Sequence, residues 1–140
     1  MTVEESIEIA CPPAVVWQFV ADPMNDPRWC PKVKRVEPSG PTTWTVAHKP
    51  VPWRPAIELE LRQVELDEPN RLLIREEDEV SVFEVEYRLE PTDAGTHFTQ
   101  ISEIEWKRLP RLLHGVFERG VHRDLRVQLR RLRDELAGRS

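Results

Sequence analysis

The sequence predicts an α+β protein in which a curved antiparallel sheet of about seven strands wraps around a long C-terminal helix. Apolar and polar residues alternate in short segments through most of the chain, which is typical of half-buried strands. From Leu109 to Leu136 apolar residues recur instead at every third or fourth position, which is typical of an amphipathic helix. The length of 140 residues suits one core, so we expect a single domain over residues 1–140.

The first thirty residues predict one strand and two short helices. The segment 3–11 alternates and runs into Pro12-Pro13, where a strand must end. An apolar helix follows and stops at Ala21-Asp22-Pro23, and a second short segment ends at Arg28-Trp29.

Six further strands are predicted before the long helix. Bounded by turn residues, they cover 32–37, 42–49, 56–66, 71–76, 80–89 and 96–106. In the third of them, the apolar residues Leu59 and Leu61 occupy odd positions, whereas Val64 and Leu66 occupy even ones. Such a change of parity within one strand indicates a bulge. A strongly curved sheet needs such a bend. The C-terminal helix, with Pro110 in its first turn, spans about 40 Å, enough to cross a small sheet.

The order of strand, double proline, Val16-Trp17-x-Phe19-Val20, Ala21-Asp22-Pro23 and Arg28-Trp29 resembles the opening of the START-like, or SRPBCC, superfamily. The polyketide cyclase/dehydrase-type members are the most similar. This resemblance implies the helix-grip fold, in which the sheet and the C-terminal helix leave a cavity for a small molecule between them. The predicted order of strand, two helices, six strands and long helix agrees with that fold over essentially the whole chain.

Composition excludes several classes of protein. Hydrophobic residues make up 39% of the chain and charged residues 32%, and no apolar run approaches the roughly 20 residues of a membrane span. The N-terminus lacks the basic and apolar regions of a signal peptide, which predicts a cytoplasmic protein. Cys11 and Cys30 lack the spacing of zinc or redox motifs and are interpreted as separate thiols. No phosphate-binding glycine motif occurs, so we expect no cofactor.

Charge is divided unevenly along the chain. Residues 107–140 hold ten Lys/Arg against four Asp/Glu, whereas residues 1–106 hold ten against twenty-one. A basic helix can attract nucleic acid or anionic lipid, but no aromatic residues interleave with these arginines, so we expect no nucleic-acid partner. We expect the helix to face water or to pair with acidic residues of the sheet. These are Glu76, Glu77, Asp78, Glu79, Glu84, Glu86 and Glu90.

Side chains that share the predicted inner faces form the candidate lining of a ligand site. A mostly apolar cavity with a few convergent polar groups is usual for such sites. In the proline-rich loop, Trp53 and Arg54 lie at the expected cavity mouth, where Arg54 can receive a carboxylate or phenolate. Each polar residue taken singly can instead be a satisfied core group. The candidate lining is Trp44, His48, Trp53, Arg54, Phe83, Tyr87, Gln100 and Ser102 from strands and loop, and Phe117, Gly120, Val121 and Asp124 from the helix.

Asp124 is distinctive because Gly120, Asp124 and Gln128 interrupt the helical stripe at intervals of four residues. A glycine inside a helix costs about 1 kcal/mol relative to alanine, so its presence on the sheet-facing side suggests that space is needed there. A carboxylate on an apolar wall pairs with a cation, shifts its pKa upward or hydrogen-bonds a ligand. An ion pair at the edge of the stripe, for example with Arg126, is the alternative, and the sequence leaves both open.

A metal site on the helix is the next candidate. His114, Glu118 and His122 follow each other at intervals of four residues, and imidazole and carboxylate are zinc ligands. They lie about 100° from the line of Phe117 and Val121, hence outward, and His114 and His122 are about 12 Å apart along the axis. One ion cannot meet all three, so we expect no metal.

Three functions are consistent with these features. The first is binding of a hydrophobic small molecule, aromatic or polyketide-like, in the cavity of a monomer or homodimer. The second, supported by the resemblance, is a polyketide aromatase/cyclase or dehydratase, which needs a proton donor and acceptor along the pocket. Asp124, His48 and Tyr87 are its acid/base candidates, with Arg54 or Gln100 stabilising an enolate or carbonyl. The third is a protein-interaction module that uses the basic C-terminal helix.

Overall fold

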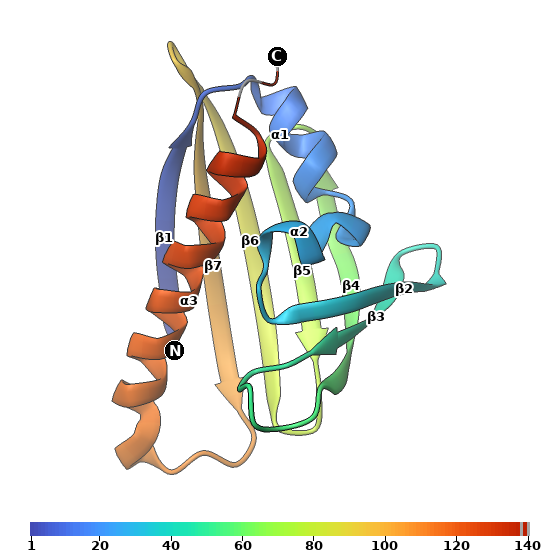
Figure 1. Cartoon of the computed structure of the whole chain (residues 1–140), viewed down its shortest axis with the longest axis vertical. Coiled ribbons are helices and arrows are strands. Elements are labelled where there is room, and N and C mark those ends of the chain that lie inside the picture. Colours follow the sequence, from blue (N-terminus) through green and yellow to red (C-terminus); the bar gives the residue numbers. More distant parts are fainter. Residues whose placement is uncertain (138, 140) are drawn as a thin grey trace.

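Seven antiparallel strands form one sheet in the order β1-β7-β6-β5-β4-β3-β2 (Figure 1). The structure is a computed structural model that describes residues 1–137 and 139. The predicted fold class is confirmed, and each predicted strand is present. The strands are β1 (Thr2–Ile9), β2 (Val33–Gly40), β3 (Thr43–His48), β4 (Ile57–Asp67), β5 (Arg71–Glu77), β6 (Ser81–Thr92) and β7 (Gly95–Trp106).

The helices follow β1 and β7, as predicted. After β1 come α1 (Pro13–Val20), the 3-10 turn η1 (Pro23–Asn25) and α2 (Asp26–Trp29), and after β7 come η2 (Arg111–Leu113) and α3 (His114–Glu135). With 22 residues, α3 spans about 33 Å and begins five residues later than the periodicity predicted. Leu112 is 94% exposed, so no packing supports an earlier start. Within the described residues, no helix is long and apolar enough to cross a membrane.

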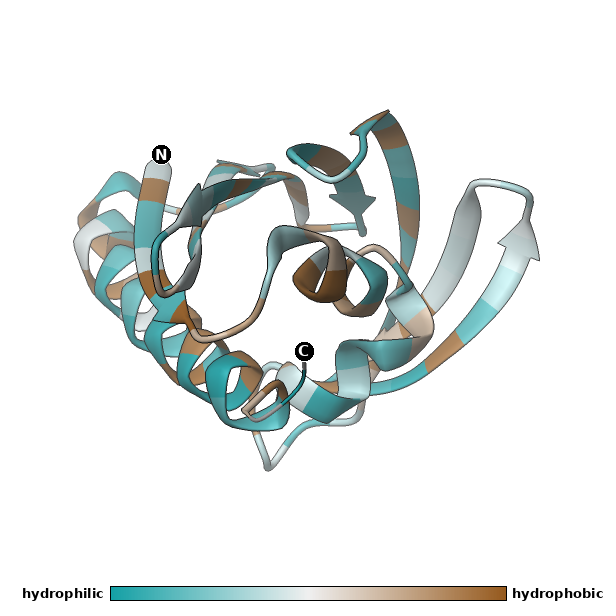
Figure 2. Cartoon of the chain, turned by 90° about the horizontal axis from the view of Figure 1, so that it is seen from above, coloured by the Kyte–Doolittle hydropathy of each residue, from teal (hydrophilic) through white to brown (hydrophobic). Residues whose placement is uncertain are grey.

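A bulge in β4 bends the sheet where the change of parity predicted it. The pairing of β4 with β5 shifts register between Gln63 and Glu65. The Gln63 side chain donates a 2.7 Å hydrogen bond from Nε2 to the carbonyl of Ala21, which ties the bulge to the end of α1. Viewed from above, the sheet curls and α3 lies across its open side (Figure 2). The curl gives the sheet a concave side that faces the helices.

Gly95 begins β7 at a point where another backbone comes very close. Its φ is +149°, and an added Cβ would lie 2.2 Å from the carbonyl oxygen of Ile9. Only glycine fits such an approach. The next residue, Thr96, donates a 2.7 Å hydrogen bond from its hydroxyl to the carbonyl of Cys11. The β6–β7 hairpin is therefore fastened to the end of β1.

Three aromatic rings fill the centre of the concave side. The ring centroids of Trp29 and Tyr87 are 5.7 Å apart, and those of Tyr87 and Phe98 are 5.4 Å apart. All three residues are buried, in the tilted or edge-on arrangements that aromatic pairs prefer. Around them lie the two cysteines, which are buried and unpaired as predicted, and the C-terminal part of α3.

Ion pairs on the sheet differ from those expected. Arg71 pairs with Glu65 and Glu86, and Arg75 with Glu77 and Glu84. The acidic residues of the sheet are thus neutralised mainly by arginines on neighbouring strands, because oppositely charged side chains on one face of a sheet lie side by side. Of the two alternatives for the basic helix, the structure favours exposure to water, since its arginines are exposed. Among the described residues, the expected acids contact this region only through Lys107, before the helix, which pairs with Glu77.

Candidate functional site

The two halves of α3 differ in their packing. From Leu125 onward, the stripe is buried through Leu129, Leu132 and Leu136. Before Leu125 the same stripe is exposed: Phe117 is 41% exposed and Val116 more so. We call residues 114–124 the open half of α3 and residues 125–136 the closed half. The apolar stripe that the sequence predicts is therefore buried only in the closed half.

The polar residues of the open half also lie differently from the prediction. His122 places Nδ1 3.4 Å from Oε1 of Glu5 on β1, and the carboxylate of Glu5 also pairs with Arg126 at 3.2 Å. His114 and Glu118 are only partly exposed. His122 therefore lies over β1 and not outward as expected, whereas His114 contacts the carbonyl of Leu109 just before the helix. Among the residues that the structure describes, no group of three ligand-type side chains is placed to hold a metal ion.

The opposite flank of the open half faces the concave side of the sheet. Phe117 contacts Trp106 edge-on with ring centroids 5.3 Å apart, and Trp106 in turn contacts Phe83 on β6 at 6.0 Å. This aromatic row (Phe83, Trp106 and Phe117) therefore runs from the sheet to the helix. Because Phe117 remains substantially exposed in it, the row is an apolar wall with one uncovered end.

An ion pair joins the same flank to the other edge of the sheet. Lys32, which directly precedes β2, places Nζ 2.6 Å from Oδ2 of Asp124, and their side chains are 35% and 31% exposed. Asp124 is therefore paired at the rim, as in the alternative that the sequence left open, and does not lie inside the cavity. The partner is neither Arg126 nor Arg54. Together with the contact between β1 and the other face of α3, this pair closes the two edges of the sheet onto one helix.

His48 lies at the end of β3, beside the start of β2, and is partly exposed. Burial, and then the nearby Lys32 ammonium, lower the pKa of the imidazole. Its alternation with Val46, which is buried, puts it on the concave side as predicted. At neutral pH the imidazole is therefore uncharged and can accept or donate a proton.

Glu76 is an acidic residue on the concave face of β5 that the candidate lining did not include. It pairs across strands with Leu61 and with Phe83 of the aromatic row. Burial, and then the charge of Asp78, raise the pKa of Glu76 to about 7. Protein surrounds the side chain, yet part of it stays accessible to water. Glu76 therefore lies on the concave side in contact with both protein and water.

Asp26 is a second buried acid, on the first turn of α2, and is 6% exposed. Burial, and then the charge of Glu76, raise its pKa well above the usual range. The indole N–H of Trp29 lies near enough to oppose this change in pKa, but it makes no hydrogen bond of normal geometry. Burial and Asp26 likewise raise the pKa of Tyr87, so this phenol stays protonated.

Gln100 contributes an unpaired acceptor to this region. It lies on β7 directly opposite Tyr87, is 5% exposed, and its Oε1 is buried without a hydrogen-bond partner among the described residues. Ser102, two residues along the same face, is also buried. The parity of β7 therefore predicted correctly that an amide and a hydroxyl point inward.

The remaining predicted lining residues do not converge with these. Trp53 and Arg54 are both exposed in the loop after β3, because its prolines hold the segment away from the sheet. Trp44 is half-buried at the other end of β3, against the core. Gly120 lies one turn before Asp124, and an added Cβ would meet only the end of the Arg123 side chain, at 4.0 Å. The position is therefore open next to the exposed Arg123, and the expected space on the sheet-facing side stays a prediction.

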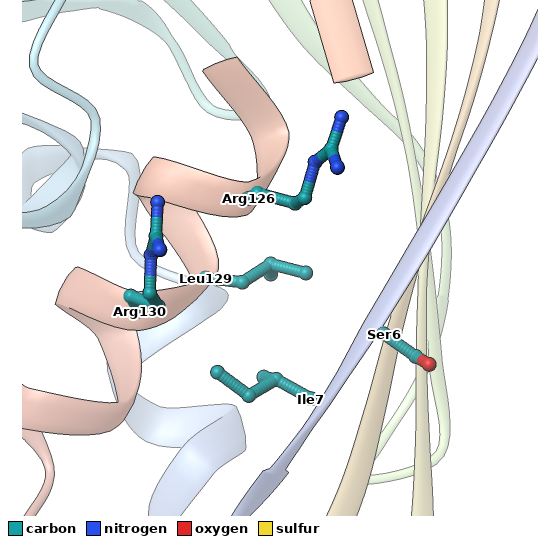
Figure 3. Close-up of a pocket in the computed structure, with 5 residues that line it drawn as sticks. All are labelled: Ser6, Ile7, Arg126, Leu129 and Arg130. Carbon is teal, nitrogen blue, oxygen red and sulfur yellow. The ribbon is translucent and has the colours of Figure 1, made fainter. Parts of the chain in front are cut away.

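Two surface hollows lie outside the predicted lining. One, of about 320 Å³, is on the convex face and is lined by Glu60, Arg62, Arg75 and Glu77. The other, of about 160 Å³, lies between β1 and α3 and is lined by Ser6, Ile7, Arg126, Leu129 and Arg130. In the second, Ile7 points toward Leu129 while Ser6 points away from the helix (Figure 3). Neither hollow contains a residue that the sequence assigned to the ligand site.

The sequence carried a signal for one of the two acids that were missed. In β5 the inward parity runs Leu72, Ile74 and then Glu76, so alternation alone places the carboxyl on the concave side. Asp26 precedes a proline in the second short helix, where its residue type is typical of a turn. Its burial follows from the docking of α2 beneath α3, which no local pattern reveals.

Comparison with known proteins identifies the family. Residues 1–137 match the sequence model of the family described as "Polyketide cyclase / dehydrase and lipid transport". The chain belongs to this family. No match is found among curated proteins. The family, like the fold, agrees with the resemblance seen in the opening of the sequence.

Solved structures share the START-like helix-grip fold at low sequence identity. The Zhui aromatase/cyclase from a Streptomyces species is 18% identical, with 96% of this chain and 92% of that chain covered and a TM-score of 0.78. A START superfamily protein from Mycobacterium smegmatis is 14% identical, with 97% and 99% covered and a TM-score of 0.81. The di-domain ARO/CYC protein BexL is 20% identical, with 100% of this chain and 48% of that chain covered and a TM-score of 0.79.

Proposed function

We propose that the protein binds a hydrophobic small molecule, aromatic or polyketide-like, between the concave side of the sheet and the open half of α3. The observation that carries this proposal is the exposure of Phe117, 41%, on a helix flank that contacts Trp106 and reaches Lys32 across the sheet. An exposed apolar wall on the inner side of a fold marks a surface that another molecule covers. The family and the aromatase/cyclase named among the similar structures support the same class of ligand.

The uncharged apolar dye Nile red tests this binding. We expect its fluorescence to rise on addition of the native protein and the tryptophan emission to fall, because Trp106 lies in the wall. Gly120→Leu adds a side chain on the flank of Asp124, where the structure leaves space, and should weaken dye binding at least about tenfold, the loss of about 1.4 kcal/mol.

Gly115→Leu is the matched control for this experiment. It makes the same substitution in the same helix, five residues earlier and thus about 140° around the axis from Gly120, where an added Cβ also meets nothing within 4 Å. Both variants replace a glycine of α3 with leucine, and the gain in helix propensity is smaller at Gly115 because it lies in the first turn. Equal dye affinity in the two folded variants contradicts the proposed location.

A cyclase or dehydratase is the second candidate function, favoured by one observation. Glu76 lies on the concave face with a pKa of about 7, and a general acid or base works best when its pKa is near the operating pH. His48, uncharged at neutral pH, is the second proton-transfer group. Glu76 and His48 are therefore the proposed catalytic residues. Asp124 and Arg54 are no longer candidates, because Asp124 is paired with Lys32 and Arg54 lies in the exposed loop.

A synthetic poly-β-ketone thioester provides the test of catalysis. A cyclase closes a carbon–carbon bond by aldol addition and releases water, so the aromatic product appears as a new ultraviolet absorbance. Glu76→Gln should lower the rate about 10²–10⁴-fold while Nile red still binds. Absence of turnover with intact dye binding would leave ligand binding as the function and reject the enzyme.

A further inference from the structure

Three connections leave the sheet at one end of the molecule. Because neighbouring strands are antiparallel, the segments that follow β3, β5 and β7 all lie at the same end, the lower one in Figure 1. We call residues 49–54, 78–80 and 107–116 the loop end. The backbone N–H of Lys107 donates a 2.9 Å hydrogen bond to the carbonyl of Val80, which joins the second and third segments. The loop end is therefore one side of the fold, built from distant parts of the chain.

The loop end carries a cluster of exposed apolar side chains. Leu112, on η2, is 94% exposed, and Trp53, in the loop after β3, is 79% exposed. Val80, Leu113 and Val116 are exposed as well. Five of the ten large apolar residues that are exposed in the described part of the chain thus lie in the loop end, so the exposure is concentrated there. Clustered apolar side chains on a surface mark a place where another molecule binds.

Unpaired cations accompany these apolar side chains. The loop end holds five Lys/Arg against two acids, Asp78 and Glu79. Among the residues that the structure describes, every arginine of the sheet forms an ion pair, whereas Arg54, Arg108 and Arg111 form none. We propose that the loop end docks on an anionic lipid surface, with its apolar side chains in the bilayer interface and its cations against the headgroups. This proposal goes beyond the proposed function and does not depend on it.

The shape of the loop end favours a lipid surface over another protein. Leu112 and Trp53 protrude from separate connections, and the two hollows described above lie on the convex face and between β1 and α3. A partner protein would need a matching recess for each protruding side chain, whereas a bilayer interface is fluid and admits apolar side chains wherever they enter. Tryptophan and leucine beside lysine and arginine are typical of proteins that bind at the surface of anionic membranes.

Vesicles of two compositions test the docking. We would measure flotation of the native protein with phosphatidylcholine vesicles and with vesicles of equimolar phosphatidylcholine and phosphatidylglycerol. Binding to the anionic vesicles should be at least about tenfold tighter, because each cation near such a surface contributes about a factor of five. The tryptophan emission should shift to shorter wavelength on binding. Trp53→Phe should remove most of this shift and still bind, because Trp53 is exposed and the other four tryptophans are buried or half-buried.

Two variants of equal charge locate the apolar contact. Leu112→Glu should weaken binding to the anionic vesicles at least about tenfold, because it places a carboxylate where an apolar side chain enters the interface. The fold should be unaffected, since Leu112 is almost fully exposed. Met24→Glu adds the same charge at another exposed apolar residue, on η1 outside the loop end, and should change binding far less. Equal losses in the two variants overturn the proposal.

Two pairs of arginines locate the charged contact. Replacing Arg108 and Arg111 with glutamine should weaken vesicle binding at least about tenfold. Replacing Arg130 and Arg131, which are exposed on the closed half of α3, removes the same charge and should leave binding unchanged. Equal losses in both pairs, or no binding of the native protein to anionic vesicles, overturn the proposal. A dimer that Leu112→Glu dissociates, without vesicle binding, would assign the loop end to a second copy of the chain and also overturn it. Nile red binding judges the proposed function separately.

Discussion

The closed and open halves of α3 belong to one helix but have different surroundings. In the closed half, Leu129 and Leu132 are buried in the core, on the part of the molecule where α3 contacts β1 and α2. In the open half, the apolar residues Val116 and Phe117 are exposed, and the nearest aromatic partner of Phe117 is Trp106 at the end of β7. The protein's own side chains therefore cover the apolar stripe of the closed half but leave that of the open half exposed.

The difference shows how a small domain separates stability from binding. The closed half packs with the ring cluster of Trp29, Tyr87 and Phe98, which supplies buried apolar area and hence stability. The open half is held in place by polar contacts at its sides, Lys32 with Asp124 and Glu5 with His122 and Arg126. Substitutions in the two halves should consequently affect different properties.

Loss of a leucine in the closed half should have the largest effect on stability. Leu132 is fully buried, and Leu132→Ala should lower the free energy of unfolding by about 2–5 kcal/mol, because a cavity is left in the core. Val116→Ala, in the open half, should change it by less than about 0.5 kcal/mol, because Val116 is 64% exposed. Urea denaturation of both variants measures the difference. Similar losses at the two sites would contradict the division into a closed and an open half.

Glu76 should make the protein less stable as the pH rises. Its pKa in the folded protein is about 7, above the ordinary value of 4.5, so folding favours the neutral form. The stability linked to this group is complete below about pH 4.5 and is lost as the pH rises through 7. The loss should be about 1–3 kcal/mol. Each pKa unit corresponds to about 1.4 kcal/mol, and the contact of the side chain with water reduces the effect.

Glu76→Gln tests this linkage by thermal denaturation at pH 5 and pH 8. The variant should exceed the native protein in stability at pH 8 and resemble it more closely at pH 5. Asp26, whose pKa is also raised, contributes the same trend to both proteins. Glu77→Gln serves as the exposed control. A native protein that becomes more stable between pH 5 and pH 8, with no gain from Glu76→Gln, would argue against a neutral Glu76.

The ion pair at the rim should have the smallest effect. Lys32 and Asp124 are each about one-third exposed, and partly exposed pairs contribute up to about 1 kcal/mol. Asp124→Asn should therefore cost less than about 1 kcal/mol, and the cost should shrink in 1 M salt. Chemical denaturation at low and high salt checks both points. A loss of about 3–5 kcal/mol would mean that the pair is buried and architectural.

Local patterns in the sequence predicted the strands well but the contacts of the long helix poorly. Alternation along β6 and β7 identified the inward faces, including Tyr87 and Gln100, because side chains in a strand point alternately to its two sides. On the helix, Phe117 was assigned to the lining of a cavity that faces the sheet, and His122 to the outside. A helical period gives the relative angles of side chains but not which angle meets the sheet, and the docking on β1 decides that.

The sequence by itself determined the order of elements, the bulge in β4 and the family, since each depends on residues close together along the chain. Only the tertiary structure decided which charges meet. Lys32 and Asp124 are 92 positions apart and join because the curled sheet brings β2 near α3. Burial, and then the charge of Glu76 on β5, raise the pKa of Asp26 on α2 only after folding brings these distant segments together. The pKa values of both acids depend on desolvation and on charges from distant segments, which exist only once the chain has folded.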